Sequence, residues 1–246
     1  MATFNIITNS RGKAGEYAEL SLNTATGCIH GCKYCYCPQV LHKTKDEFHN
    51  NIVLKKDFIE RFEMDCLKLQ KDGYKGRVHL SFATDPYQPD ERVMNQTKLA
   101  IIYMDLYNIN FQILTKGGTR ACKDFKLYKP GDAFACTITT LDDEKAKIWE
   151  PQAALPSNRL EALKQAHSLG IETWISLEPV IWPEDSLAII EATHEFVGHY
   201  KIGPLNYNKQ IREAIDWKAF TSSAVALLVK YGKPYYIKED LLKLIQ

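Results

Sequence analysis

Four cysteines fall within ten residues of this chain, in the stretch Cys28-Ile29-His30-Gly31-Cys32-Lys33-Tyr34-Cys35-Tyr36-Cys37. Two tyrosines lie between them, and Gly27 and Pro38 flank the stretch. The chain holds seven cysteines, an odd number, and clustered cysteines in a reducing compartment favour metal binding over a disulfide framework. The stretch therefore predicts a metal site. The remaining cysteines stand alone in the sequence: Cys66, Cys122 and Cys136.

The composition is typical of a soluble globular protein. Of 246 residues, 45% are hydrophobic and 25% charged, enough for one domain with a sizeable core. We expect a single domain over residues 1–246, with its core at about 20–205 and a helical extension with a short strand at 206–246. A net charge of +1 gives the protein no overall electrostatic attraction to nucleic acid. No leader-like start and no membrane-length apolar segment is present, so we expect a cytoplasmic protein with no membrane partner.

Strand-like and helix-like segments alternate along most of the chain. Residues 1–20 are polar and mixed, and they predict a loosely packed lead-in. The expected strands cover residues 20–26, 77–83, 110–114, 133–139, 171–177, 196–202 and 235–237. The expected helices cover residues 57–71, 91–107, 119–128, 142–150, 158–168, 184–193 and 211–230, with a small helix at the end.

This alternation predicts β/α units around a parallel sheet. About six or seven units fit, which indicates a closed or partly open (β/α) barrel. A doubly wound sheet is the alternative, but no Gly-x-Gly-x-x-Gly follows the first strand. Chemistry in such barrels lies at the carboxyl ends of the strands. Polar groups stand at those ends: the cysteine stretch, Thr84-Asp85-Pro86-Tyr87, Thr115-Lys116-Gly117-Gly118, Thr139-Thr140, Glu178-Pro179 and residues 201–206.

The cysteine spacing leaves two kinds of metal open. Cys28, Cys32 and Cys35 form a C-x3-C-x2-C pattern. A structural zinc site has four ligands, usually in two pairs, and Cys37 or a nearby histidine could complete it. Three cysteines on a short loop could instead carry a four-iron cluster with one iron free to bind a small molecule. A non-catalytic zinc-binding adaptor and a catalytic iron–sulfur site are therefore both possible from the residue types alone.

The pattern resembles the signature of the radical S-adenosylmethionine (radical SAM) superfamily. The spacing, the aromatic residue before the third cysteine and the place after the first barrel strand all agree. The chain also resembles the spore photoproduct lyase-like group of DNA photolyase-type enzymes, through Cys-x-x-Gly-Cys-x-Tyr-Cys-Tyr at 28–36, Thr-Asp-Pro-Tyr-Gln-Pro at 84–89, Leu-Thr-Lys at 114–116 and Ile-Thr-Thr-Leu-Asp at 138–142. The resemblance covers about residues 20–205 and implies a partial (β/α)6-type TIM barrel.

By this resemblance, Cys28, Cys32 and Cys35 would hold a four-iron four-sulfur (4Fe-4S) cluster, and S-adenosylmethionine would chelate the fourth iron. One electron from a reducing partner such as flavodoxin or ferredoxin would then release a 5'-deoxyadenosyl radical. The implied cofactor-binding residues are Tyr34 against the adenine, Lys116 on the methionyl carboxylate, and Thr84, Asp85, Thr139 and Glu178 on the remaining polar groups. Packing or helix capping is the alternative role for most of these side chains.

The implied activity is a lyase that repairs UV-induced pyrimidine photoproducts in DNA. In spore photoproduct lyase a cysteine at the end of the second barrel strand donates hydrogen, and tyrosines beside the cluster relay it. Tyr34 and Tyr36 match those tyrosines and are the candidate catalytic residues, but residues 81–85 hold no cysteine. A cyclobutane dimer can be split without an external thiol, so this absence favours that lesion, or radical SAM modification of RNA, a peptide or a metabolite. Cys37 and Cys136 could replace the donor only if they face the barrel mouth, and Cys136 has the features of a small buried hydrophobe.

UV-damaged DNA and the reductant are the expected partners of a monomeric protein. Without an added lesion-recognition domain, contacts to DNA would come from basic and aromatic residues at the barrel rim. The candidates are Lys116, Arg120, Lys123, Lys126, Arg159, Lys209, Tyr87, Trp182 and Tyr207. Solvated surface charge is the alternative role for the lysines.

Overall fold

The centre of the protein is an eight-stranded sheet in the order β1-β2-β5-β6-β7-β8-β9-β10. The structure is a computed structural model that describes residues 4–246, so Met1–Thr3 lie outside the described residues. The sheet strands are β1 (Ile7–Asn9), β2 (Leu20–Leu22), β5 (Arg77–Leu80), β6 (Asn110–Thr115), β7 (Ala133–Thr137), β8 (Glu172–Val180), β9 (His199–Pro204) and β10 (Tyr235–Ile237).

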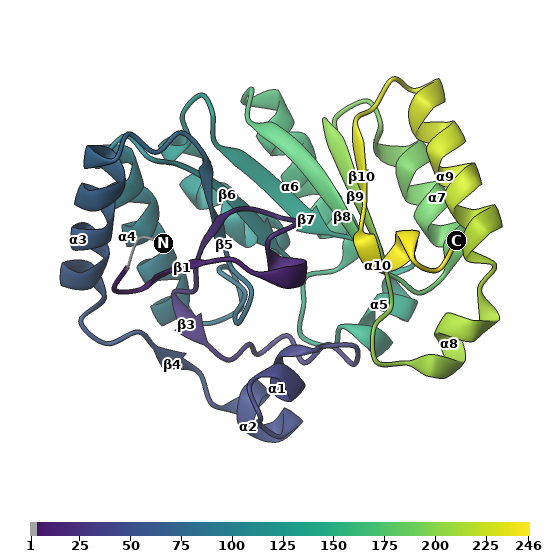
Figure 1. Cartoon of the computed structure of the whole chain (residues 1–246), viewed down its shortest axis with the longest axis horizontal. Coiled ribbons are helices and arrows are strands. Elements are labelled where there is room, and N and C mark those ends of the chain that lie inside the picture. Colours follow the sequence, from purple (N-terminus) through teal and green to yellow (C-terminus); the bar gives the residue numbers. More distant parts are fainter. Residues whose placement is uncertain (1–3) are drawn as a thin grey trace.

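The sheet is parallel from β2 to β10, and β1 runs antiparallel along β2. Because successive strands are neighbours and crossovers are right-handed, the connecting helices fall on one face. Figure 1 shows the curved sheet with the purple N-terminal segment on its other face. The edge strands β1 and β10 are not paired with each other, so the sheet is open. This confirms the predicted partial (β/α) barrel.

The helices agree with most of the predicted segments. They are α1 (Cys37–Val40), α2 (Lys45–Asn50), α3 (Phe58–Lys71), α4 (Glu91–Leu106), α5 (Asp143–Trp149), α6 (Pro156–Ser168), α7 (Pro183–Thr193), α8 (Lys209–Ala214), α9 (Trp217–Lys230), α10 (Glu239–Leu242) and the 3-10 helices η1 (Gly12–Ala14) and η2 (Gly118–Leu127). The Asp90 carboxylate caps α4 by accepting the Arg92 N–H, and Thr44 and Glu47 form a capping box at α2. Within residues 4–246, no helix combines the length and apolarity needed to cross a membrane.

Apolar strand residues form the core between sheet and helices. Phe111, Ile113 and Phe134 are fully buried in it. Each such side chain stabilises the fold by about 1.5–3 kcal/mol relative to an exposed one. This core fixes the strand ends, and with them the position of the polar residues that follow each strand.

Residues 4–20, the described part of the predicted lead-in, contradict the expectation of loose packing. Strand β1 adds to the sheet edge, and the Asp65 carboxylate on α3 accepts the backbone N–H groups of Ile6 and Ile7 at 2.8 and 2.9 Å. No local sequence pattern could predict these hydrogen bonds, because the acceptor Asp65 lies about 60 residues from Ile6 in the chain.

The predicted strand at residues 20–26 is divided in two. Asn23 interrupts it, because its side-chain oxygen accepts the N–H groups of Phe82 and Ala83 at 2.8 and 2.6 Å. Beyond it, β3 (Ala25–Thr26) leaves the sheet and pairs with β4 (Val53–Leu54). This departure carries the cysteine stretch across the carboxyl ends of the strands.

Two helical predictions also differ in detail. Residues 118–127 form a 3-10 helix, and the region 211–230 breaks in two where the Asp216 carboxylate accepts the Ala219 N–H at 2.9 Å and starts α9. The single domain over residues 1–246 stays a prediction, although β10 of the expected extension pairs with β9.

Candidate active site

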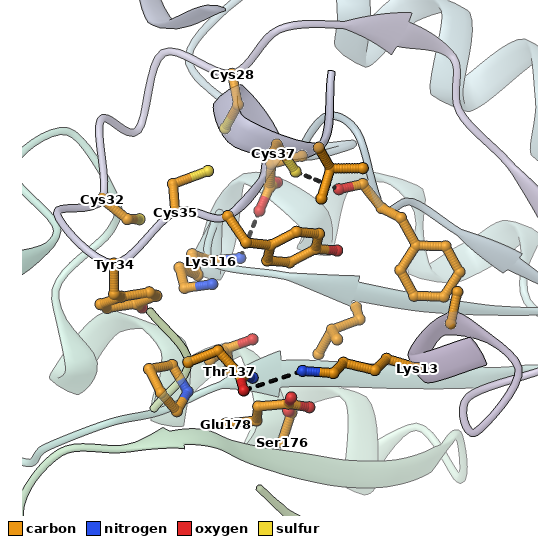
Figure 2. Close-up of a pocket in the computed structure, with 18 of the residues that line it drawn as sticks. Lys13, Cys28, Cys32, Tyr34, Cys35, Cys37, Lys116, Thr137, Ser176 and Glu178 are labelled. Carbon is orange, nitrogen blue, oxygen red and sulfur yellow. Dashed lines mark hydrogen bonds between the residues drawn. The ribbon is translucent and has the colours of Figure 1, made fainter. Parts of the chain in front are cut away.

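A cavity of about 440 Å³ opens at the carboxyl ends of the strands. Figure 2 shows the cysteines at one end of it and Ser176 and Glu178 at the other. Most of the predicted site residues line it: Cys28, Cys32, Cys35, Tyr34, Tyr36, Thr84, Asp85, Lys116 and Glu178. Thr139 is not among the lining residues, whereas Thr137 is. Most of the polar residues that the sequence places at strand ends therefore lie around this cavity.

The cysteine loop is held firmly by the surrounding backbone. At Gly27 the backbone has φ 103°, and a Cβ there would lie 2.7 Å from the Asn51 carbonyl oxygen, so glycine alone fits. The Thr84 hydroxyl donates to the Gly27 carbonyl at 2.7 Å, and the Lys33 N–H donates to the Trp149 carbonyl at 2.8 Å. In this structure Thr84 fixes the loop.

The Cys28, Cys32 and Cys35 thiols line one end of the cavity, where three thiolates on one loop could hold an iron–sulfur cluster. Burial raises the pKa of the Cys28 thiol and raises that of Cys32 to about 12, so neither ionises unaided at neutral pH.

The Asp85 carboxylate is engaged by the protein itself. It accepts from the Thr115 hydroxyl at 2.5 Å and from the backbone N–H groups of Lys116 and Tyr87 at 2.8 and 2.9 Å, and it faces His30 at 3.4 Å. Burial alone would raise the pKa of Asp85, but His30 and these hydrogen bonds outweigh it and lower the pKa below its usual range. Asp85 thus fixes the backbone that presents Lys116.

Lys116 places a positive charge inside the cavity. Its ammonium lies 5.5 Å from the centre of the Tyr34 ring and forms no ion pair with a carboxylate of the described residues. Burial lowers the pKa of Lys116, yet the nearby Cys32 and Glu150 outweigh burial and raise it overall. The lysine is therefore charged at neutral pH and available to an anion.

A buried ion pair holds Tyr34 in place. Glu150 and Arg159 are both inaccessible to solvent, and Glu150 accepts from the Arg159 guanidinium and the Tyr34 hydroxyl. Arg159 also donates to the Thr137 carbonyl at 2.9 Å, at the end of β7. The Thr139 hydroxyl lies 3.5 Å from Glu150, which places it behind the cavity wall.

The opposite end of the cavity has a second polar network. The Tyr17 hydroxyl lies 2.5 Å from the Glu178 carboxylate and 3.0 Å from the Ser176 hydroxyl. The buried Lys238 ammonium lies 3.3 Å from Glu178 and 3.0 Å from Glu16. Because the charges are paired, this end can bind an uncharged polar group.

Cys37 lies beside the end of β5. Its thiol donates to the Phe82 carbonyl at 3.0 Å. Cys37 and Tyr36 both line the cavity, and Figure 2 shows Cys37 there. The hydrogen bond with Cys35 and then burial raise the pKa of Cys37, so this thiol keeps its hydrogen at neutral pH. Cys136, in contrast, is fully buried in the core, as expected for a small hydrophobe.

Sequence reasoning missed several of these residues. Ser176 could have been found, because residues two apart in a strand share a face with Glu178. Tyr17 and Lys238 come from segments outside the predicted barrel core, and no local pattern marked them. Glu150 could not be assigned without its partner Arg159.

Three of the predicted DNA-contacting rim residues are placed differently. Arg159 and Tyr87 are fully buried, and Arg120 donates to the Tyr87 carbonyl at 2.7 Å. The prediction was wrong for Arg159 and Tyr87, because a basic or aromatic residue after a strand can be satisfied internally. Tyr207 is 63% exposed and borders the cavity.

The sequence matches the family model of the radical SAM superfamily over residues 22–197. The chain belongs to the radical SAM superfamily. Its cofactors are accordingly a 4Fe-4S cluster and S-adenosylmethionine, and a structural neighbour contains bound AdoMet. This membership favours the iron–sulfur site over the zinc-binding adaptor.

Two curated relatives are similar to this radical SAM protein in sequence. The uncharacterized protein ORF301 of Acidianus two-tailed virus is 30% identical over 174 residues, which cover 66% of this chain and 56% of the viral protein. The uncharacterized protein MJ0683 of Methanocaldococcus jannaschii is 26% identical over 194 residues, covering 77% and 71%. The chain thus spans little more than half of the viral relative's length.

Solved structures share the fold. Spore photoproduct lyase complexed with dinucleoside spore photoproduct has a TM-score of 0.71 at 12% identity, covering 94% of this chain and 79% of the lyase. A mutant of that lyase with bound AdoMet and the same lesion has a TM-score of 0.72 at 12% identity, with the same coverage. Streptococcus suis SuiB bound to S-adenosylmethionine has a TM-score of 0.64 at 12% identity, covering 88% of this chain and 46% of SuiB. At these identities the likeness concerns the fold alone.

Proposed function

We propose that this radical SAM enzyme is a lyase that repairs UV-induced pyrimidine photoproducts in DNA, in the manner of spore photoproduct lyase. The observation that carries the proposal is the Cys37 thiol, which lies in the cavity 3.0 Å from the Phe82 carbonyl just beyond β5. The lyase has its donor cysteine at the end of the equivalent strand. A thiol in this place supports hydrogen donation to a lesion-derived radical.

Cys28, Cys32 and Cys35 hold the cluster in this proposal. When bound, the cluster and S-adenosylmethionine supply a 5'-deoxyadenosyl radical that removes a hydrogen atom from the substrate. Lys116 binds the methionyl carboxylate, because its charge faces the cavity without an ion pair. Tyr34, whose hydroxyl donates to Glu150, would lie against the adenine. Asp85, Thr84 and Thr139 contribute by holding the walls of the cofactor site.

Cys37 then donates its hydrogen atom to the substrate radical, forming a C–H bond and leaving a sulfur radical. Tyr36 lies beside Cys37, with 43% of its surface exposed toward the cavity and solvent. Its hydroxyl can return a hydrogen atom to the sulfur, and the tyrosyl radical left on Tyr36 then takes one electron from the reductant and one proton from solvent. Cys37 and Tyr36 thus form the relay that Tyr34 and Tyr36 were predicted to form. The buried hydrogen bond to Glu150 assigns Tyr34 to positioning instead.

The far end of the cavity suits a pyrimidine base. Tyr17, Ser176 and Glu178 offer hydroxyl and carboxylate groups to an uncharged polar ring, and the Glu178 carboxylate is paired with the Lys238 ammonium at 3.3 Å. A cavity thiol also removes the reason to prefer a cyclobutane dimer, which rested on a missing donor.

The test uses protein reconstituted anaerobically with iron, sulfide, dithionite and S-adenosylmethionine. Separate oligonucleotides carry a spore photoproduct, a cyclobutane dimer or a 6-4 photoproduct, and an undamaged oligonucleotide is the control. We expect the loss of one lesion type, followed by mass spectrometry, to accompany formation of 5'-deoxyadenosine. Cofactor cleavage that leaves all three lesions intact would contradict the proposal.

A second candidate is the same radical chemistry on RNA, a peptide or a metabolite. It is favoured by the burial of Arg159 and Tyr87, which removes two of the expected DNA contacts. Comparison of small molecules, RNA and proteins in cells with and without the enzyme distinguishes the two candidate functions. If the enzyme only repairs DNA, cells that lack it should accumulate lesions and show no other change.

A further inference from the structure

A groove of about 460 Å³ lies next to the active-site cavity. Its walls come from the cysteine loop and α1, from the segment leading into α2, from the end of α5 and from residues 205–208. The volume lies in the range of pockets that hold one small molecule, so the groove accommodates a unit the size of a nucleotide. The proposed repair chemistry assigns no role to it.

The charge of this groove is one-sided. Lys33, Lys43 and Lys45 line it, and among its described lining residues there is no aspartate or glutamate. None of the three forms an ion pair with a carboxylate of residues 4–246, and Lys45 donates to the Lys33 carbonyl at 3.2 Å. Glu47 is close in the chain, but its carboxylate accepts from the Thr44 hydroxyl at 2.8 Å and does not line the groove. In a chain with a net charge of only +1, the three lysines therefore make a local positive field.

Two aromatic side chains line the same groove. Trp149 lies at the end of α5, half-buried against Trp182, with the two ring centres 5.6 Å apart. Tyr207 is 63% exposed, and its backbone has φ 62°, in the left-handed region that a residue with a bulky side chain seldom adopts. Residues with such strain cluster at ligand-binding sites. The groove thus combines positive charge with rings on which a base can stack, as in proteins that bind single-stranded nucleic acid.

The groove and the cavity share a wall. Tyr34, Cys35, Leu205, Asn206 and Tyr207 line both spaces. Because Tyr207 is largely exposed, it lies at the rim between the two openings. A chain molecule with one unit in the cavity can therefore pass over Tyr207 and place its next units in the groove.

We propose that this groove binds the nucleotides next to the lesion, as a single strand that crosses the rim at Tyr207. The inference rests on the proposed repair function, because a damaged base of the same strand then occupies the cavity. Phosphates of the strand lie against Lys33, Lys43 and Lys45, and a base stacks on Tyr207. Enzymes that act on a base inside DNA take it out of the stack, and a site for the adjoining strand stabilises the opened form.

The geometry favours a nucleic-acid strand over an acidic protein. A protein partner needs a broad contact face, whereas the groove is a recess with the volume of a small-molecule site. Stacking on Tyr207 needs a flat ring, which every nucleotide supplies. An acidic protein in the groove is therefore the competing outcome of the test.

The test measures binding of a short fluorescein-labelled oligothymidine to the anaerobic, cluster-containing protein, by fluorescence anisotropy at several salt concentrations. The groove variant carries three substitutions: Lys33→Gln, Lys43→Gln and Lys45→Gln. The matched control replaces exposed lysines in segments that precede β5 and β7, toward the amino ends of the strands: Lys71→Gln, Lys75→Gln and Lys126→Gln.

We expect the wild-type affinity to fall with salt, because each contact between a lysine and a phosphate releases a counterion. The slope of log affinity against log salt should be smaller by about 2 in the groove variant, at about 0.7 for each lysine on a single strand. Its affinity at low salt should fall roughly tenfold or more, while the lysine control matches the wild type. Unchanged affinity and slope in the groove variant would overturn the proposal.

Tyr207→Ala should weaken oligothymidine binding roughly tenfold without changing the salt slope, because stacking releases no counterion. Tyr235→Ala replaces another exposed tyrosine and should bind like the wild type. A Tyr207→Ala variant with full affinity would contradict the path over the rim.

A lesion that the enzyme repairs separates the groove from the cavity. The groove variant should have a raised KM for the lesion inside an oligonucleotide, with kcat and KM unchanged for the same lesion as a dinucleoside. Loss of affinity for an acidic flavodoxin with oligothymidine affinity intact would overturn the proposal. Oligothymidine binding as expected, with every lesion left intact, would support the groove and contradict the repair function instead.

Discussion

The Tyr17 hydroxyl lies 2.5 Å from the Glu178 carboxylate, joining the N-terminal segment to the end of β8. Replacing Tyr17 with Phe removes one hydrogen bond, while Lys238 still pairs with Glu178. We expect a loss of about 1 kcal/mol in the free energy of unfolding. Substrate turnover should fall much more than stability, because the hydroxyl faces the substrate end of the cavity. Urea unfolding and product formation measure the two effects.

Tyr236→Phe is the matched control, because its hydroxyl bonds Glu16 at 3.2 Å outside the cavity. The control should keep full turnover. If Tyr17→Phe also kept full turnover, the assignment of this end of the cavity to the substrate would be wrong.

Arg159→Ala should be strongly destabilising. The change leaves the Glu150 charge buried without its partner, and such a loss costs about 3–5 kcal/mol. Replacing both residues together, Glu150→Leu with Arg159→Met, should recover much of this stability. Urea unfolding of the single and double variants checks the expectation, and a double variant as unstable as Arg159→Ala would argue against it.

Lys116→Met should weaken S-adenosylmethionine binding but leave the iron content unchanged. Losing a charged contact of about 1.5–3 kcal/mol lowers affinity roughly tenfold to a hundredfold. Equilibrium dialysis and iron analysis provide the readouts, with Lys126→Met at an exposed site as the control. A variant that loses its iron would show that Lys116 supports the cluster instead.

Stability should fall in acid because of His79. Burial and the charges of Lys201 and Lys238 lower the pKa of His79 to about 3. The unfolded chain takes up a proton below about pH 6.5, whereas the folded chain does not until about pH 3, so stability declines as pH falls through this window. The slope reaches about 1.4 kcal/mol per pH unit for this group.

Urea unfolding of cluster-free protein at several pH values measures this effect. His79→Gln should flatten the profile, and the same substitution at exposed His167 should leave it as it is. His30 and His199, whose pKa values burial also lowers to about 4, contribute in the same direction. A His79→Gln profile as steep as that of the wild type would contradict the assignment.

Much of the fold could be predicted because each β/α unit carries its own local pattern. The apolar residues of β7 and the glycine that follows α6 can be recognised in the sequence without knowing which elements pack against them. Strand β1 is not readable in this way, since Asp65 supplies the acceptors for its approach. Likewise, Asn23 looks like an ordinary strand residue until Phe82 and Ala83 are placed opposite it.

The candidate site also contains residues that could be predicted from the sequence and residues that could not. The cysteines, Lys116 and Glu178 stand at strand ends and were predicted to converge. Cys37 was uncertain, because the direction of its thiol depends on the four-residue helix α1 that begins at it. Arg159 was misplaced at the rim, because its burial depends on a single carboxylate nine residues earlier in the chain.

The most direct test of the central claim is a repair reaction run in D2O with wild-type protein and with Cys37→Ala. The Cys37 hydrogen exchanges with solvent, so the repaired pyrimidine from the wild type should carry one deuterium by mass spectrometry. The variant should cleave the cofactor but release little or no deuterated product. Wild-type product without deuterium, or equally labelled product from Cys37→Ala, would show that Cys37 is not the donor and would contradict the account.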